Sequence, residues 1–198
     1  MKTLLCVDCC IRGAHSRTRQ VEEAFLGALD LSKEYRVERL FLCDEKALSP
    51  MDAASLAQRD ELLAQKRFDH PRFRYARQFA AADKIVVAAP FWDLSFPALL
   101  KIYVENVCAQ GISFDCDAQN GCFGICRADR LLYISARGGV YENSPMECGA
   151  AYFEKLCRFW GIGRFECIAP EGLDLGLEAP ENILARAVNE AIEMARAF

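Results

Sequence analysis

Short apolar runs alternate along this chain with longer stretches in which apolar residues recur at every third or fourth position. The first pattern is typical of buried strands and the second of amphipathic helices. The run at residues 85–89 (IVVAA) is apolar throughout, as expected of a central parallel strand covered on both faces. The run at 36–42 alternates charged and apolar residues, which predicts an edge strand. Five strands are predicted, at residues 3–7, 36–42, 85–89, 131–135 and 165–169.

The stretches between these runs predict helices that pack on the sheet. The sequence Ser144-Pro145-Met146-Glu147 is a helix-start signal, with serine as the N-cap, proline at the first position and glutamate closing a capping box. The other helices are predicted at residues 16–29, 51–67 and 71–82, from Pro97, and from Pro180.

One segment, residues 112–125, breaks this alternation. It carries Asn120-Gly121 between two short runs, which is a hairpin-turn signal. We therefore predict a β-hairpin inserted between the fourth helix and the fourth strand. The rest of the pattern predicts an α/β fold, with a five-stranded, doubly wound parallel sheet and helices on both faces. No linker or repeat interrupts it, so one domain over residues 1–198 is expected.

Composition narrows the class of protein. The chain has 198 residues, of which 53% are hydrophobic and 26% charged, as in a soluble globular protein. No run approaches the roughly 18 apolar residues of a membrane span, and the N-terminal run stops at Asp8, which argues against a signal peptide. The net charge is −4 and no basic run occurs, so nucleic acid is not an expected partner.

The chain contains 11 cysteines, an odd number scattered through apolar strands and helices. This does not resemble a secreted disulfide framework, so we expect reduced thiols and a cytoplasmic location. The segment with Cys116, Cys122 and Cys126, like the adjacent pair Cys9-Cys10, raises the alternative of a metal- or redox-sensing module. None of these spacings is the CxxC pairing of strong zinc sites, and we predict no metal.

Ligands of open α/β sheets bind beyond the carboxyl ends of the strands, so the loops after the first, third and fourth strands should carry the chemistry. The first loop contains Cys9, His15, Ser16, Arg17 and Thr18 at the start of a helix. Backbone amides and hydroxyls there suit an anion such as a phosphate. The alternative is an ordinary turn in which Ser16 is only the helix cap.

The second loop runs Pro90-Phe91-Trp92-Asp93-Leu94. Two large aromatic residues directly after a central strand suit a flat, amphipathic ring, which would pack against them and accept backbone hydrogen bonds. The alternative is that Phe91 and Trp92 only cap the core.

The third loop contains Ser135, Arg137, Gly138, Gly139 and Tyr141. Two glycines allow a ligand to approach the backbone closely, and Arg137 with the loop amides would stabilise an electron-rich ring edge. A plain glycine turn is the alternative.

Together the three loops resemble the flavodoxin-like NAD(P)H quinone reductase and FMN-dependent NADH azoreductase family. The segment APFWDLSFP at 89–97 is similar to the family's A-P-M-Y-N-F-S-I-P, and SARGGVY at 135–141 to S-R-G-G-x-Y. The stretch from Lys101 to Phe114 is similar to the family's helix-to-hairpin segment. The chain departs from the family at Cys9-Cys10, where serines are usual, and at Asp93, where asparagine is usual.

The resemblance implies an FMN-dependent oxidoreductase that takes hydride from NADH or NADPH and reduces quinones, azo compounds or similar small acceptors in a ping-pong reaction. It implies a flavodoxin-like fold and a homodimer. FMN would place its phosphate around His15–Thr18 and its ring against Pro90–Leu94 and Arg137–Gly139, with Cys9 and Ser135 as neighbours; Tyr141 and His15 are candidate proton donors. The alternative is a non-catalytic electron carrier of the flavodoxin type, which needs no substrate pocket.

Overall fold

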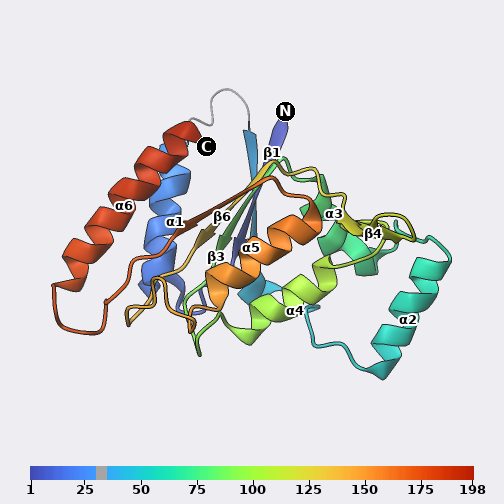
Figure 1. The fold of residues 1–198 in the computed structure, drawn as a ribbon, viewed down its shortest axis with the longest axis horizontal. Coiled ribbons are helices and arrows are strands. Elements are labelled where there is room, and N and C mark those ends of the chain that lie inside the picture. Colours follow the sequence, from blue (N-terminus) through green and yellow to red (C-terminus); the bar gives the residue numbers. More distant parts are fainter. Residues whose placement is uncertain (30–34) are drawn as a thin grey trace.

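The computed structural model describes residues 1–29 and 35–198, and its centre is a five-stranded parallel sheet (Figure 1). The strand order is β2-β1-β3-β6-β7, in which the chain winds outward in both directions from β1 and β3. All five predicted strands and the doubly wound topology are confirmed. The strands are β1 (Lys2–Asp8), β2 (Tyr35–Phe41), β3 (Lys84–Ala88), β6 (Arg130–Ile134) and β7 (Arg164–Ile168).

The burial of each strand follows its sequence pattern. Every residue of β3 is buried, because β1 and β6 flank it and helices cover both of its faces. Strand β2 lies at one edge of the sheet, and only Leu40 of its seven residues is fully buried. The edge position explains why β2 alternates charged and apolar residues, since the side chains of an edge strand stay partly exposed to solvent.

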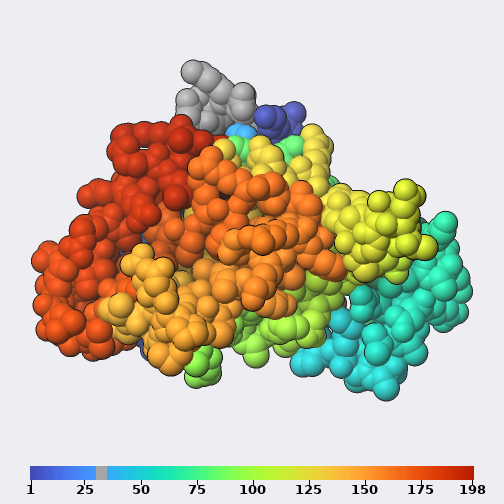
Figure 2. Space-filling view, viewed as in Figure 1, coloured from blue at the N-terminus to red at the C-terminus, as the bar shows by residue number. Residues whose placement is uncertain are grey.

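Helices cover both faces of the sheet (Figure 1). Helices α1 and α6 lie together on one face, where Phe25 and Phe198 meet edge to face at 5.0 Å. Helices α3, α4 and α5 cover the other face, and the space-filling view shows α5 in front with α2 and the hairpin at one edge (Figure 2). The helices are α1 (Arg17–Ala28), α2 (Ala53–Ala64), α3 (Arg74–Ala81), α4 (Ala98–Val107), α5 (Gly149–Trp160) and α6 (Pro180–Ala197). None of the helices in the described residues is both long and apolar enough to cross a membrane.

The predicted hairpin is confirmed as β4 (Phe114–Asp117) and β5 (Gly121–Gly124), an antiparallel pair outside the main sheet. Residues 118–120 form its turn, so Gly121 is the first residue of β5 and lies outside the turn; the Asp117 carboxylate accepts hydrogen bonds from the Gln119 and Asn120 amides. Gly121 then adopts φ +68°, a left-handed conformation that favours glycine.

The hairpin also corrects the expectation that every cysteine is a free thiol. Cys116 and Cys122 are direct cross-strand partners, and they form a disulfide. Directly opposed residues of an antiparallel pair share one face of the sheet, which brings the two sulfur atoms together. The other nine cysteines have no disulfide.

The helix predicted to begin at Pro145, with Ser144 as its N-cap, begins four residues later, at Gly149. The Ser144 hydroxyl accepts a hydrogen bond from the Met146 amide, which forms a local turn instead of a helix cap. Glu147 does cap the helix, but from outside it: its carboxylate accepts from the Ala150 and Ala151 amides at 2.8 and 3.1 Å. The prediction was wrong about the boundary because Glu147 serves a helix that starts after it.

Candidate cofactor site

A cavity of about 270 Å³ lies beyond the carboxyl ends of the strands, between the start of α1 and the loops after β3, β6 and β7. This is the sheet edge at which doubly wound folds bind their ligands. The start of α1 gives the cavity polar and cationic side chains, and the loop after β3 gives it aromatic and apolar ones; we call these two parts the polar end and the apolar end. The polar end is lined by Arg12, His15, Ser16, Arg17 and Thr18, and the apolar end by Pro90, Phe91, Trp92 and Leu173.

The polar end is built on the N-terminus of α1. Ser16 is its N-cap, and its hydroxyl accepts from the Arg19 amide at 3.3 Å. The amides of Arg17 and Thr18, which also lie in the first turn, donate to no acceptor within residues 1–29 and 35–198. Unpaired first-turn amides together with the helix dipole attract an anion. Ser16 is thus a helix cap, and it also lines an anion-binding end of the cavity.

Thr18 joins this helix to the loop after β6. Its side chain is 1% exposed, and its hydroxyl oxygen accepts from the Ala136 amide at 3.1 Å. The hydroxyl hydrogen of Thr18 stays available to donate, because accepting uses only an oxygen lone pair. The bond fixes the distance between the two walls of the cavity.

The aromatic end is formed by the loop after β3. Phe91 packs on Tyr141 with ring centroids 4.6 Å apart, and the Arg137 guanidinium lies 5.3 Å from the Phe91 ring centre. Trp92 lines the cavity and keeps 38% of its surface exposed. An exposed tryptophan beside a cavity provides a flat apolar surface for a ring-shaped ligand.

Asp93 and Leu94 do not line the cavity. They form the tip of a two-residue turn closed by paired backbone hydrogen bonds between Trp92 and Ser95. Their φ angles are +49° and +66°, which is costly for a residue with a side chain and more so for leucine than for aspartate. This strained turn fixes where the backbone places Trp92.

Arg137 is 4% exposed and is held by two carboxylates. Its guanidinium pairs with Glu171 at 2.6 Å and with Glu147 at 3.0 Å. Glu171 also accepts from the Tyr141 and Glu142 amides, so one buried arginine ties together the walls that follow β6 and β7. Its charge is balanced inside the protein. Arg137 and Gly138 both line the cavity, and the two ion pairs fix the position of this turn.

Several residues expected at the site lie away from the cavity. Cys9 and Ser135 are completely buried, and Cys9 packs in the core beneath α4 and α3. Burial raises the pKa of the Cys9 thiol to about 12, so it stays protonated. Gly139 and Tyr141 lie in the adjoining loop and do not line the cavity. Tyr141 packs on Phe91, which does line it. Cys9, where serine is usual in the family that the chain resembles, therefore makes a core contact and does not face the cavity.

Leu173 and Asp174 line the cavity without having been expected there. They lie in the loop after β7, which the backbone binds to the turn after β6: the amides of Gly172, Leu173 and Asp174 donate to the carbonyls of Gly139, Arg137 and Gly138. The strand order explains why this loop reaches the cavity. Strand β7 is the neighbour of β6, so the loops that follow these two strands lie side by side.

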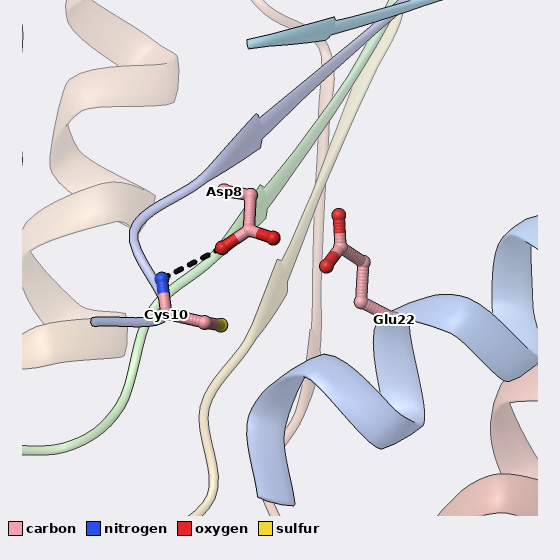
Figure 3. A group of neighbouring side chains, drawn as sticks. All are labelled: Asp8, Cys10 and Glu22. Atoms are coloured by element: carbon pink, nitrogen blue, oxygen red, sulfur yellow. Dashed lines mark hydrogen bonds between the residues drawn. The ribbon is translucent and has the colours of Figure 1, made fainter. Parts of the chain in front are cut away.

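A buried acidic cluster lies directly beneath the first loop (Figure 3). Asp8, at the end of β1, accepts from the Cys10 amide at 2.7 Å and pairs with Arg19 at 2.6 Å. Glu22 points at it from α1, and the ligand atoms of Asp8, Cys10 and Glu22 lie within 4.8 Å of one another. Burial, followed by the nearby Asp8 charge, raises the Glu22 pKa to about 7. Since Arg19 already pairs with Asp8 and the pKa of the Cys10 thiol is raised by burial, the cluster is a poor metal site.

A family model described as a flavodoxin-like fold matches residues 1–195. The FMN-dependent NADH:quinone oxidoreductase 2 of Clostridium acetobutylicum is 42% identical over 133 residues, 66% of each chain. The chain therefore spans slightly less than two thirds of the length of that relative.

Two further comparisons extend over more of the molecule. The FMN-dependent NADH:quinone oxidoreductase of Lachnoclostridium phytofermentans is 35% identical over 81% of this chain and 80% of its own. The crystal structure of an azoreductase from Bacillus anthracis superimposes over the whole of both chains with a TM-score of 0.87 and 26% identity. With the sheet order, the cavity at its carboxyl edge and a family match over nearly every residue, the chain belongs to the flavodoxin-like fold family.

Proposed function

We propose that this protein binds FMN in the cavity and uses it to pass electrons from NADH or NADPH to a small acceptor such as a quinone or an azo compound. The observation that carries the proposal is the division of the cavity into an anion-binding end on α1 and an aromatic end after β3. FMN has the same division, with a phosphate at one end and a flat ring at the other. The names of the relatives support the same chemistry.

The donor set fits FMN. The unpaired amides of Arg17 and Thr18, with the Thr18 hydroxyl, would hold the phosphate. Trp92, Phe91 and the turn at 137–138 would flank the ring. FMN supplies the hydride and electron transfer itself, and the protein supplies position and surroundings.

Two residues are proposed as proton donors, His15 and Tyr141. His15 lines the polar end of the cavity, and Tyr141 lies behind Phe91. Because FMN carries the electron chemistry, replacing either residue should slow turnover without abolishing it. Quinone reduction that disappears in Tyr141→Phe, with FMN still bound, would contradict this division of roles.

The first experiment compares FMN binding and NADH-dependent quinone reduction in the purified protein and in Trp92→Ala. Stacking on an aromatic side chain contributes about 1–3 kcal/mol, so we expect FMN affinity to fall about 5- to 150-fold. Leu56→Ala on α2 is the matched control, since Leu56 is similarly exposed at 43% and lies outside the cavity lining. Equal effects of the two substitutions on FMN affinity would show that Trp92 does not contact the flavin. FMN that binds without supporting quinone reduction would favour the electron carrier.

We further infer a homodimer. Large apolar side chains are exposed on the loops after β3, β6 and β7, including Trp92 (38% exposed), Val140 (61%) and Leu177 (84%). Burying such side chains against a second copy of the chain would stabilise a dimer. Light scattering on the purified protein should give twice the chain mass of 22.2 kDa. Val140→Glu should shift the mass toward that of the monomer, and a wild-type monomer would contradict the inference.

The cytoplasm is the proposed location, with residues 1–198 acting as one domain. Nine of the eleven cysteines form no disulfide, which supports a reducing compartment, whereas the Cys116–Cys122 disulfide of the hairpin does not. Cell fractionation tests this location, and recovery of the protein outside the cytoplasm would contradict it.

A further inference from the structure

A salt bridge joins two of the residues that line the cavity. Arg17, in the first turn of α1, donates to Asp174 from the loop after β7, with Nη1 and Oδ1 2.8 Å apart. Both residues line the cavity, and their side chains remain 34% and 64% exposed. The pair therefore bridges two walls of the cavity within reach of solvent.

The fold holds Asp174 in this place. The Asp174 amide donates to the Gly138 carbonyl at 2.9 Å, and the amide of Leu173 donates to Arg137 at 3.2 Å. Gly138 makes room for the carboxylate, because a Cβ atom added there would lie 2.3 Å from Asp174 Oδ2. The position of this carboxylate thus depends on a backbone anchor and on a missing side chain.

The charge of Asp174 is opposite to that of the ligand the cavity suits. Arg12 and Arg17 are cationic, and Asp174 is the one acidic residue among the described residues that line the cavity. A phosphate on the α1 amides would lie beside Arg17, which already has a carboxylate partner. Phosphate and carboxylate therefore compete for one guanidinium, and they repel each other.

We propose that Asp174 is an intrinsic competitor for the phosphate: it holds Arg17 in the cofactor-free protein and sets how tightly and how selectively a phosphorylated flavin binds. This rests on the proposed FMN function and adds a determinant of cofactor affinity and specificity. FMN binding exchanges the Arg17–Asp174 pair for an Arg17–phosphate pair, with no covalent step.

The test measures the dissociation constants of FMN and riboflavin with flavin-free protein, from the quenching of flavin fluorescence. Riboflavin has the same ring and side chain but no phosphate. In Asp174→Asn we expect FMN to bind about five- to tenfold more tightly at low salt, with riboflavin unchanged. Glu178→Gln is the control, because it removes one negative charge from the same loop but pairs with Arg186 outside the cavity.

A second pair of variants tests the role of Arg17. In Arg17→Met, the gain from Asp174→Asn should shrink to about twofold, since the competition runs through the guanidinium. The inference is overturned if Asp174→Asn leaves FMN affinity unchanged or lowers it, if riboflavin gains equally, or if Glu178→Gln has the same effect. Wild-type protein that binds neither flavin overturns the proposed function and this inference together, whereas FMN binding unaffected by Asp174→Asn overturns this inference alone.

Discussion

Replacing Glu22 by glutamine is expected to raise the free energy of unfolding by about 3 kcal/mol at pH 8 and to leave it nearly unchanged at pH 4. Glu22 is 0% exposed and its Oε2 has no partner among the described residues. Burial, and then the charge of Asp8, raise its pKa from 4.5 to about 7. The folded protein therefore keeps a proton that the unfolded chain has already lost between these two values.

As pH rises from about 4.5 to about 7, the unfolded state binds fewer protons than the folded state, and this group lowers stability. Above pH 7 the penalty is complete and constant. Glutamine has the shape of protonated glutamate and no charge, so it removes the penalty without changing the packing.

Three groups surround the Glu22 carboxyl group. Cys6 donates to its Oε1 at 2.7 Å, Arg39 lies 3.4 Å away, and Asp8 faces it from β1 (Figure 3). Urea unfolding at a series of pH values measures the effect. Glu23→Gln, one residue along α1 and 51% exposed, is the control and should change stability by less than about 1 kcal/mol. Loss of stability in Glu22→Gln at pH 8, or an equal gain at pH 4, would contradict the raised pKa.

Removing the charge of Arg137 is expected to cost about 3–5 kcal/mol of stability in Arg137→Met. The reason is that Glu147 and Glu171, whose side chains are 12% and 14% exposed, would be left as buried, unpaired carboxylates. The same change should loosen the turn at 137–138, so FMN affinity should fall with stability. Denaturant unfolding and flavin titration measure the two effects.

The matched variant is Arg137→Met combined with Glu147→Gln and Glu171→Gln. It keeps the apolar stem and removes all three charges, so more than half of the lost stability should return. Glutamine also retains an oxygen that accepts from the amides of Ala150 and Tyr141, which the two carboxylates now bind. A triple variant as unstable as Arg137→Met would show that packing of the guanidinium, and not charge balance, is the dominant contribution.

The strands were predictable from sequence because the burial of a strand in the sheet determines its pattern of apolar and polar residues. The all-apolar run at 85–89 matches β3, which is buried on both faces, and the alternating run at 36–42 matches the edge strand β2. The start of α5 was not predictable from local signals. Ser144 and Glu147 fit a capping box, but Glu147 is shared with Arg137, a contact formed only in the folded protein.

The candidate site shows the same limit. The cavity residues Ser16 and Thr18 lie at the start of the helix after the first predicted strand, and Phe91 and Trp92 follow the third, so topology alone predicted their place at this edge of the sheet. Which side chains turn into the cavity depends on the alternation of a strand's last residues, and Cys9 and Ser135 turn into the core instead. Leu173 and Asp174 enter because β7 pairs with β6, a neighbour relation that periodicity does not contain.

The most direct test of the central claim is the absorbance spectrum of the FMN-loaded protein before and after anaerobic addition of NADH, and then of a quinone. We predict that the oxidised flavin band bleaches with NADH and returns with the quinone. The Trp92→Ala variant should need more FMN to reach the same loaded state. A protein that holds no FMN, or a bound flavin band that neither NADH nor NADPH bleaches, would contradict the account.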